Sequence, residues 1–303
     1  MTNSNTIKVT CFGELLWDYL PGEEKKAGGA SFNVAYNLFK MGIDSHIISA
    51  VGNDALGDEI ISKIKKWGIY TENIQVSNKY PTGTVIATFD QNKEAHYDLT
   101  SDVAWDYIEA KPNDKQLVRE SSALVFGSLA SRNRKSRNSL FELLEDSSFN
   151  VFDINLRKPH YDFNLLKELL HKADIAKFNK AELLMVLDFL CKPYTSEEDA
   201  VKQVQDIFKL REIIISKGSK GALYVNDGNF HLYPALNITI ADTIGSGDSF
   251  LAGFLSKRFV RGATVKDIMQ QATALGAFIT SKVGACPEYT PLEFQQFKNH
   301  KTS

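Results

Sequence analysis

The chain has 303 residues, of which 43% are hydrophobic and 24% are charged, and its net charge is −2. This is the composition of an ordinary globular protein with enough apolar material for a sizeable core. The near balance of charge gives no support to general binding of nucleic acid or of a membrane surface. Three widely spaced cysteines, together with the lack of an apolar signal segment or membrane-spanning run, favour a reduced, cytoplasmic setting.

The first hundred residues mix helical and extended patterns. We expect strands at 7–13 and 46–51, a helix at 31–41, a helix into which 52–57 leads and which runs through 66, and a hairpin with strands at 84–89 and 94–99. The hairpin strands alternate polar and apolar residues, as in a sheet with one wet face. Together with the extended run after the first strand, they predict a small β element drawn from residues 14–27 and 81–103. Such an element beside an α/β core is typical of a lid that excludes water from a bound ligand.

From residue 115 onward, helical patterns alternate with continuous apolar strands. The strands are expected at 123–127, 150–154, 174–178 and 212–216, and the helices at 135–146, 162–172, 180–189 and 197–209. These repeated units predict one α/β domain spanning 1–303, with a mainly parallel central sheet covered by helices on both faces. The remaining elements are a hairpin-like pair at 221–225 and 230–233, a β-like run at 236–241, and helices from Ser246, at 264–282 and after Pro291.

The chain is organised around the turn at 241–253, which joins that β-like run to a helical pattern. Gly245 and Gly247 permit the tight backbone of such a turn, and the free N–H groups and dipole of the following helix create an anion site. Asp248 falls in the first turn of this helix. It either stabilises the helix or takes a proton from a hydroxyl beside the bound anion. No P-loop, dinucleotide fingerprint or nucleophile elbow is present in the sequence.

The turn resembles the signature Asp-Thr-x-Gly-Ala/Ser-Gly-Asp of the ribokinase-like (PfkB) carbohydrate kinases. The residues from Asp242 to Asp248 match all seven positions. The resemblance implies that Asp248 is the catalytic base and that Gly245, Ser246 and Gly247 form the anion hole for the transferred phosphoryl group. It also implies the ribokinase-like fold with a small β-sheet lid.

Further matches carry the resemblance over most of the chain. In the family, the glycines and asparagine of a Gly-Gly-x-x-x-Asn-x-Ala signature bind sugar hydroxyls, and Gly28, Gly29 and Asn33 match it. Asp18 matches the family's sugar-binding aspartate, although an aspartate before Pro-Gly is also a common turn former. Arg157 follows a buried strand at the carboxyl end, where it either steers a phosphate or pairs with a helix.

The nucleotide and metal residues are implied in the same way. Asn179 and Glu182 match an Asn-x-x-Glu motif that positions the triphosphate and holds Mg²⁺ through water, and this spacing is also that of a capping box. The other matches are Lys217, Gly218 and Gly221 in a loop that lines the nucleotide, Thr273 near the adenine in place of the usual asparagine, and Asp242 where relatives hold a monovalent cation such as K⁺.

The sequence therefore predicts an ATP-dependent sugar kinase that uses Mg²⁺. Fructose is the expected acceptor because the runs at 11–18 and 103–108 look like those of bacterial fructokinases. Ribose, 2-keto-3-deoxygluconate and nucleosides are the alternative acceptors, and a non-catalytic sugar-binding regulator on the same fold is an alternative class. We expect sugar and ATP as the only small-molecule partners, and a homodimer joined through the lid.

Overall fold

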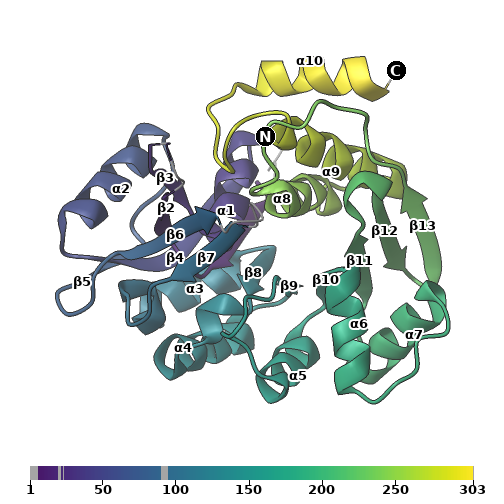
Figure 1. Cartoon of the computed structure of the whole chain (residues 1–303), viewed down its shortest axis with the longest axis horizontal. Helices are drawn as coiled ribbons and strands as arrows, with labels where there is room; N and C mark the ends of the chain where they lie inside the picture. The colour runs from purple at the N-terminus through teal and green to yellow at the C-terminus, as the bar shows by residue number, and fades with distance from the viewer. Residues whose placement is uncertain (1–5, 20–21, 23, 90–94, 303) are drawn as a thin grey trace, which may run out of the picture.

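The computed structural model describes residues 6–19, 22, 24–89 and 95–302. A nine-stranded sheet crosses the molecule in the order β13-β12-β11-β10-β9-β8-β1-β4-β5 (Figure 1). Its strands are β1 (Lys8–Phe12), β4 (Asp44–Gly52), β5 (Ile74–Ser77), β8 (Ala123–Gly127), β9 (Asn150–Asp153), β10 (Ile175–Asn179), β11 (Glu212–Ser216), β12 (Ala222–Asn226) and β13 (Asn229–Tyr233). The strands from β11 to β5 run parallel, whereas β12 and β13 add an antiparallel edge.

Helices cover both faces of this sheet, as the sequence predicts. One face carries α1 (Ala30–Lys40), α2 (Ala55–Lys66), α8 (Ser246–Arg258), α9 (Val265–Thr280) and α10 (Pro291–Thr302). The other carries α3 (Pro112–Glu120), α4 (Arg134–Asp146), α5 (Phe163–Lys172), α6 (Lys180–Phe189) and α7 (Glu197–Phe208). Neighbouring residues of one strand enter opposite cores: Val125 joins the first and Phe126 the second. The strands therefore read as continuous apolar runs because both of their faces are buried.

A second, four-stranded sheet lies beside the main one, in the order β3-β2-β6-β7 (Figure 1). It contains β2 (Leu16–Tyr19), β3 (Lys26–Gly28), β6 (Gly83–Phe89) and β7 (Ala95–Leu99). The expected small β element is thus confirmed, and its two parts meet through the parallel pairing of β2 with β6. The turn expected at 90–93 lies outside the described residues.

One expectation about an element needs correction. The β-like run at 236–241 is not a strand: residues 234–240 have no regular structure, and Ile240 is 62% exposed. Two backbone N–H groups at the end of this run instead donate to the carbonyl of Thr280, at the end of α9. The hairpin-like pair expected at 221–225 and 230–233 is confirmed as β12 and β13, and because β12 also pairs with β11 it extends the main sheet. The sequence analysis did not identify β5 or α3, which are short and amphipathic.

The parallel strands β1, β9 and β10 end at the same edge of the sheet, so the residues that follow them are brought together. The cavity described below opens at this edge, between the sheet and β2 of the small sheet. Within the described ranges, no helix combines the length and apolar character needed to cross a membrane.

We predict that Asp54 anchors the start of the small sheet. Its side chain caps α2 by accepting from Gly57 N (2.8 Å), and it also accepts from the backbone N (2.8 Å) and hydroxyl (2.7 Å) of Thr82. Asp54→Ala should lower the free energy of unfolding by about 1–2 kcal/mol, as measured by urea denaturation. Asp58→Ala, at an exposed position of the same helix turn, is the control and should cost much less. Equal losses in the two variants would contradict the anchoring role.

Candidate active site

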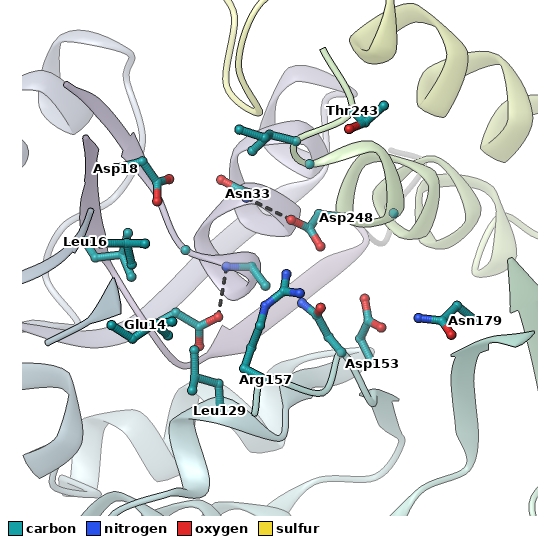
Figure 2. Close-up of a pocket in the computed structure, with 18 of the residues that line it drawn as sticks. Glu14, Leu16, Asp18, Asn33, Leu129, Asp153, Arg157, Asn179, Thr243 and Asp248 are labelled. Atoms are coloured by element: carbon teal, nitrogen blue, oxygen red, sulfur yellow. Dashed lines mark hydrogen bonds between the residues drawn. The ribbon is translucent and has the colours of Figure 1, made fainter. Parts of the chain in front are cut away.

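Many polar side chains line a cavity of about 360 Å³ at the carboxyl edge of the main sheet. Figure 2 shows Asp18, Asn33, Arg157 and Asp248 directed toward its centre. The small sheet contributes an apolar wall, which includes Leu16, Val85 and Leu99. Most of the ionisable groups come from the ends of the main-sheet strands, the segments that follow them and the start of α8, whereas Asp18 comes from β2 of the small sheet. The cavity therefore combines an apolar side with a charged side, as ligand sites commonly do.

The predicted anion-binding turn is present at the start of α8. Gly245 adopts φ 72°, a left-handed conformation that favours glycine, and a side chain there would collide with Ala285. The N–H groups of Gly247 and Asp248 belong to the first helical turn, where no intrahelical acceptor exists. The Ser246 hydroxyl accepts from the hydroxyl of Thr280 at 2.9 Å and keeps its own hydrogen as a donor. The turn thus supplies backbone donors and the positive end of a helix dipole.

Asp248 lies at this turn and is 8% exposed. Its Oδ2 accepts a hydrogen bond of 2.8 Å from Nδ2 of Asn33 on α1. Burial, followed by the negative charge of Asp153, raises the pKa of Asp248 to about 6, although Lys177 and Asn33 oppose the shift. A carboxylate with a pKa near neutrality is well matched to accepting a proton from a hydroxyl.

The residues expected to bind the sugar lie close to one another. Gly28 on β3 packs so closely against the Asp18 carboxylate that any side chain at Gly28 would collide with it. Gly29 caps α1 with φ 112°, and a side chain there would collide with the backbone of Glu14. Burial and the charge of Asp248 raise the pKa of Asp18 to about 7, while Arg157 lowers it. The structure therefore places Asp18, Gly29, Asn33 and Arg157 in one cavity.

Asn179 and Glu182 form the capping box at the start of α6. Asn179 Oδ1 accepts from Glu182 N at 2.9 Å, and Glu182 Oε2 accepts from Asn179 N at 2.7 Å. Glu182 Oε1 also accepts from Leu156 N at 2.9 Å, which ties α6 to the segment after β9. The capping interpretation is therefore confirmed, and both side chains also line the cavity.

The donor chemistry of this corner fits a magnesium ion held through water. Each oxygen of Glu182 accepts one backbone N–H and retains a lone pair for a water molecule. Among the described residues, no group of three or more His, Cys, Asp or Glu side chains is arranged to hold a metal directly. Magnesium bound mainly by water and phosphate oxygens needs few protein ligands.

The predicted nucleotide loop lines a neighbouring cavity of about 490 Å³, which includes Asn179, Ser216, Lys217 and Gly218. Lys217 Nζ forms an ion pair with Glu197 at 2.6 Å. Gly221 closes the loop against the backbone of β13, where a side chain would not fit.

Thr273 is not brought to this region. Its hydroxyl donates to the carbonyl of Met269 on its own helix at 2.8 Å, and it lines neither cavity. The place of Thr273 near the adenine, carried over from the family's asparagine, stays a prediction.

Asp242 joins two loops rather than standing free. Its Oδ1 accepts from Ile244 N and its Oδ2 from Gly284 N, both at 2.9 Å. These bonds hold the anion-binding turn against the segment that follows α9. The role of Asp242 beside a monovalent cation stays a prediction.

Three charged residues of the cavity were missed by the sequence analysis. Lys177 Nζ forms an ion pair of 2.7 Å with Asp153 Oδ2, and both side chains are buried. Glu14 is 3% exposed; its Oε1 accepts from Ala30 N at 2.9 Å, while its Oε2 has no partner in the described part of the chain. The sequence contained one sign of this ion pair, because Lys177 is a charged residue inside the otherwise apolar run at 175–178. A charge in such a strand is rarely buried unless it is paired.

Comparison with known proteins identifies the family. Residues 11–291 match the pfkB family of carbohydrate kinases. The chain is 25% identical to a probable fructokinase of Arabidopsis thaliana, over 99% of each chain. It is 27% identical to an ATP-dependent 6-phosphofructokinase of Thermoanaerobacterium thermosaccharolyticum, over 91% of this chain and 89% of the relative.

The three-dimensional fold is also similar to the folds of solved protein structures. An uncharacterized sugar kinase from Pyrococcus horikoshii in complex with ATP superposes with a TM-score of 0.83 and is 25% identical, over 97% of this chain and 100% of the other. The expected ribokinase-like fold is confirmed. The chain belongs to the pfkB family of carbohydrate kinases, which are phosphotransferases with an alcohol group as acceptor.

Proposed function

We propose that this carbohydrate kinase transfers the γ-phosphoryl group of ATP to a primary hydroxyl of fructose, and that residues 1–303 act as one kinase unit. One observation carries the proposal: the Asp248 carboxylate lies at the anion-binding turn and is hydrogen-bonded to Asn33. It shares a cavity with Asp18 and Arg157. A base, an anion site and an acceptor site are thereby within reach of one small ligand.

In this mechanism Asp248 accepts the proton of the sugar hydroxyl as its oxygen attacks the γ-phosphorus. The bond from the γ-phosphorus to the bridging oxygen breaks, and ADP leaves with the electron pair. The N–H groups of Gly247 and Asp248, in the turn that Gly245 begins, receive the charge of the transferred group, and Arg157 adds a positive charge on the acceptor side. Mg²⁺, held through water near Glu182, would neutralise phosphate charge. Positioning and electrostatics supply most of the catalysis.

Asp18 and Asn33 hold the acceptor in this proposal, with Gly28 leaving room for the Asp18 carboxylate and Gly29 lining the cavity. The choice of fructose is supported by the fructokinase name of a relative that covers almost the whole chain. Ribose, 2-keto-3-deoxygluconate and nucleosides stay as alternative acceptors, and the phosphofructokinase relative adds fructose 6-phosphate. A non-catalytic regulator is disfavoured because it would not need Asp248 at the anion site.

The small sheet is proposed to close over the acceptor and to pair with the same sheet of a second subunit. Ile86 on β6 is 48% exposed, which is unusual for an isoleucine in the middle of a strand. An apolar side chain on the outer face of a small sheet is well suited to such a contact.

Asp248→Asn should lower kcat by about 10²–10⁴-fold, because the amide keeps the shape of the carboxylate but cannot take the proton. The Kd values for sugar and nucleotide, measured by calorimetry, should change little. Asp58→Asn, at an exposed site on α2, should retain full activity. Near wild-type turnover in Asp248→Asn would remove Asp248 from the role of base.

The pH dependence follows from the two raised carboxyl pKa values. Asp248 and Asp18 act in their ionised forms, so kcat/KM for the sugar should be lost as the pH falls through about 7 and about 6. A plot of log kcat/KM against pH should approach a slope of two below pH 6. Asp18→Asn should reduce this slope to one and leave a midpoint near 6. A wild-type profile that stays flat down to pH 5 would contradict the assignment.

The acceptor is tested by initial rates with fructose, ribose, glucose, 2-keto-3-deoxygluconate and fructose 6-phosphate. Fructose should be the best substrate, and Asp18→Ala should lower its kcat/KM by about 10–100-fold, since a charged acceptor of hydrogen bonds is lost. The KM for ATP should hardly change. Faster turnover of another sugar would refute the choice of fructose. An unchanged kcat/KM in Asp18→Ala would leave Asp18 as a turn residue.

A further inference from the structure

The buried ion pair between Lys177 and Asp153 spans two neighbouring strands of the main sheet. Lys177 on β10 lies directly opposite Asp153 on β9 in the parallel register, and their side chains are 7% and 8% exposed. Burial would lower the pKa of Lys177, but the negative charges of Asp153 and Asp248 outweigh this effect and raise it. The ammonium group is therefore charged throughout the neutral pH range.

The ammonium group lies at the anion-binding turn. Lys177 Nζ is 3.2 Å from the position that a Cβ atom would occupy on Gly247, so it borders the first turn of α8. Asp248 and Glu182 both contribute to the electrostatic field at this ammonium. Lys177 thus lies within reach of the proposed base and of the proposed metal position, and all three side chains line one cavity.

Stability alone does not account for this pair. Replacing a buried ion pair by apolar residues of similar size is often neutral or stabilising. An ammonium group has three donors, and the described residues use one of them, in the bond to Asp153. The remaining donors can serve an anion at the turn without moving the lysine.

We propose that Lys177 is a further catalytic residue, which binds the phosphoryl group at the turn of α8 during its transfer, and that Asp153 positions it. The inference rests on the proposed kinase reaction. Lys177 donates hydrogen bonds to phosphoryl oxygens while the bond to the sugar oxygen forms and the bond to the leaving ADP breaks. It keeps its proton, because Asp248 receives the proton of the sugar hydroxyl.

The test uses two variants of the full-length chain: Lys177→Gln, and the double variant Lys177→Gln with Asp153→Asn. The first leaves a buried carboxylate unpaired, whereas the second is neutral and avoids that penalty. We expect kcat to fall by about 10²–10³-fold in both variants, as when a single stabilising donor is removed from a transition state. The thermal midpoint of unfolding should recover in the double variant. Lys172→Gln, which removes an exposed ion pair with Glu145, is the control.

Nucleotide affinity gives a readout that does not depend on turnover. Calorimetry without sugar should show that both Lys177 variants lose about tenfold or more in affinity for ATP relative to ADP, because only ATP carries the γ-phosphoryl group. Restored kcat in the double variant, or an unchanged preference for ATP over ADP, would overturn the proposal and leave a purely structural ion pair. If the wild type phosphorylated no sugar, the proposed function would fail, and the comparison of ATP with ADP would still decide the role of Lys177.

Discussion

The hydrogen bond between Asn33 and Asp248 joins residues separated by 215 positions in the sequence, and the rest of the site depends on it. It connects the first turns of α1 and α8, two helices that pack against each other on the same face of the sheet. Asn33 also accepts from the thiol of Cys286 at 3.3 Å, so its amide has a defined orientation. The amide donates to the base through its nitrogen because its oxygen is already engaged.

The cavity holds more negative than positive charge before any ligand enters. Among the described lining residues, the carboxyl groups are Glu14, Asp18, Asp153, Glu182 and Asp248, and the cations are Arg157 and Lys177. Burial and mutual repulsion raise several of these carboxyl pKa values. This excess suits the proposed roles of accepting a proton and holding a magnesium ion, and the proposed reaction also requires fixed donors to receive phosphate oxygens.

The sequence predicted the elements best where their physical signal was continuous. The buried strands at 123–127 and 212–216 and the helix at 180–189 have the bounds that their apolar patterns indicate. The prediction of a strand-like run at 236–241 was wrong. Its apolar residues alternate as in a strand, but in the described part of the chain this run pairs with no strand. A local sequence pattern indicates which structure a segment can form, but the pairing of a β-strand depends on residues far away in the chain.

The same distinction applies to the site. Asp248 and Asn33 were identified as candidate site residues because they belong to short motifs whose glycines can be recognised in the sequence. Lys177 and Asp153 were missed because their importance lies in the register between two strands. Thr273 was assigned only from its position in the family's pattern, and its hydroxyl donates within its own helix.

The segment after α9 has a consequence for the order in which the protein is made. Tyr289 donates to Asn37 of α1, Tyr36 donates to the carbonyl of Pro287, and Ala285 fills the space left by Gly245. The end of helix α1 leaves the ribosome about 250 residues before these partners emerge. At about 5–20 residues per second, the nascent chain waits roughly ten seconds or more with the end of α1 uncovered. During translation this surface is a natural place for a chaperone to bind.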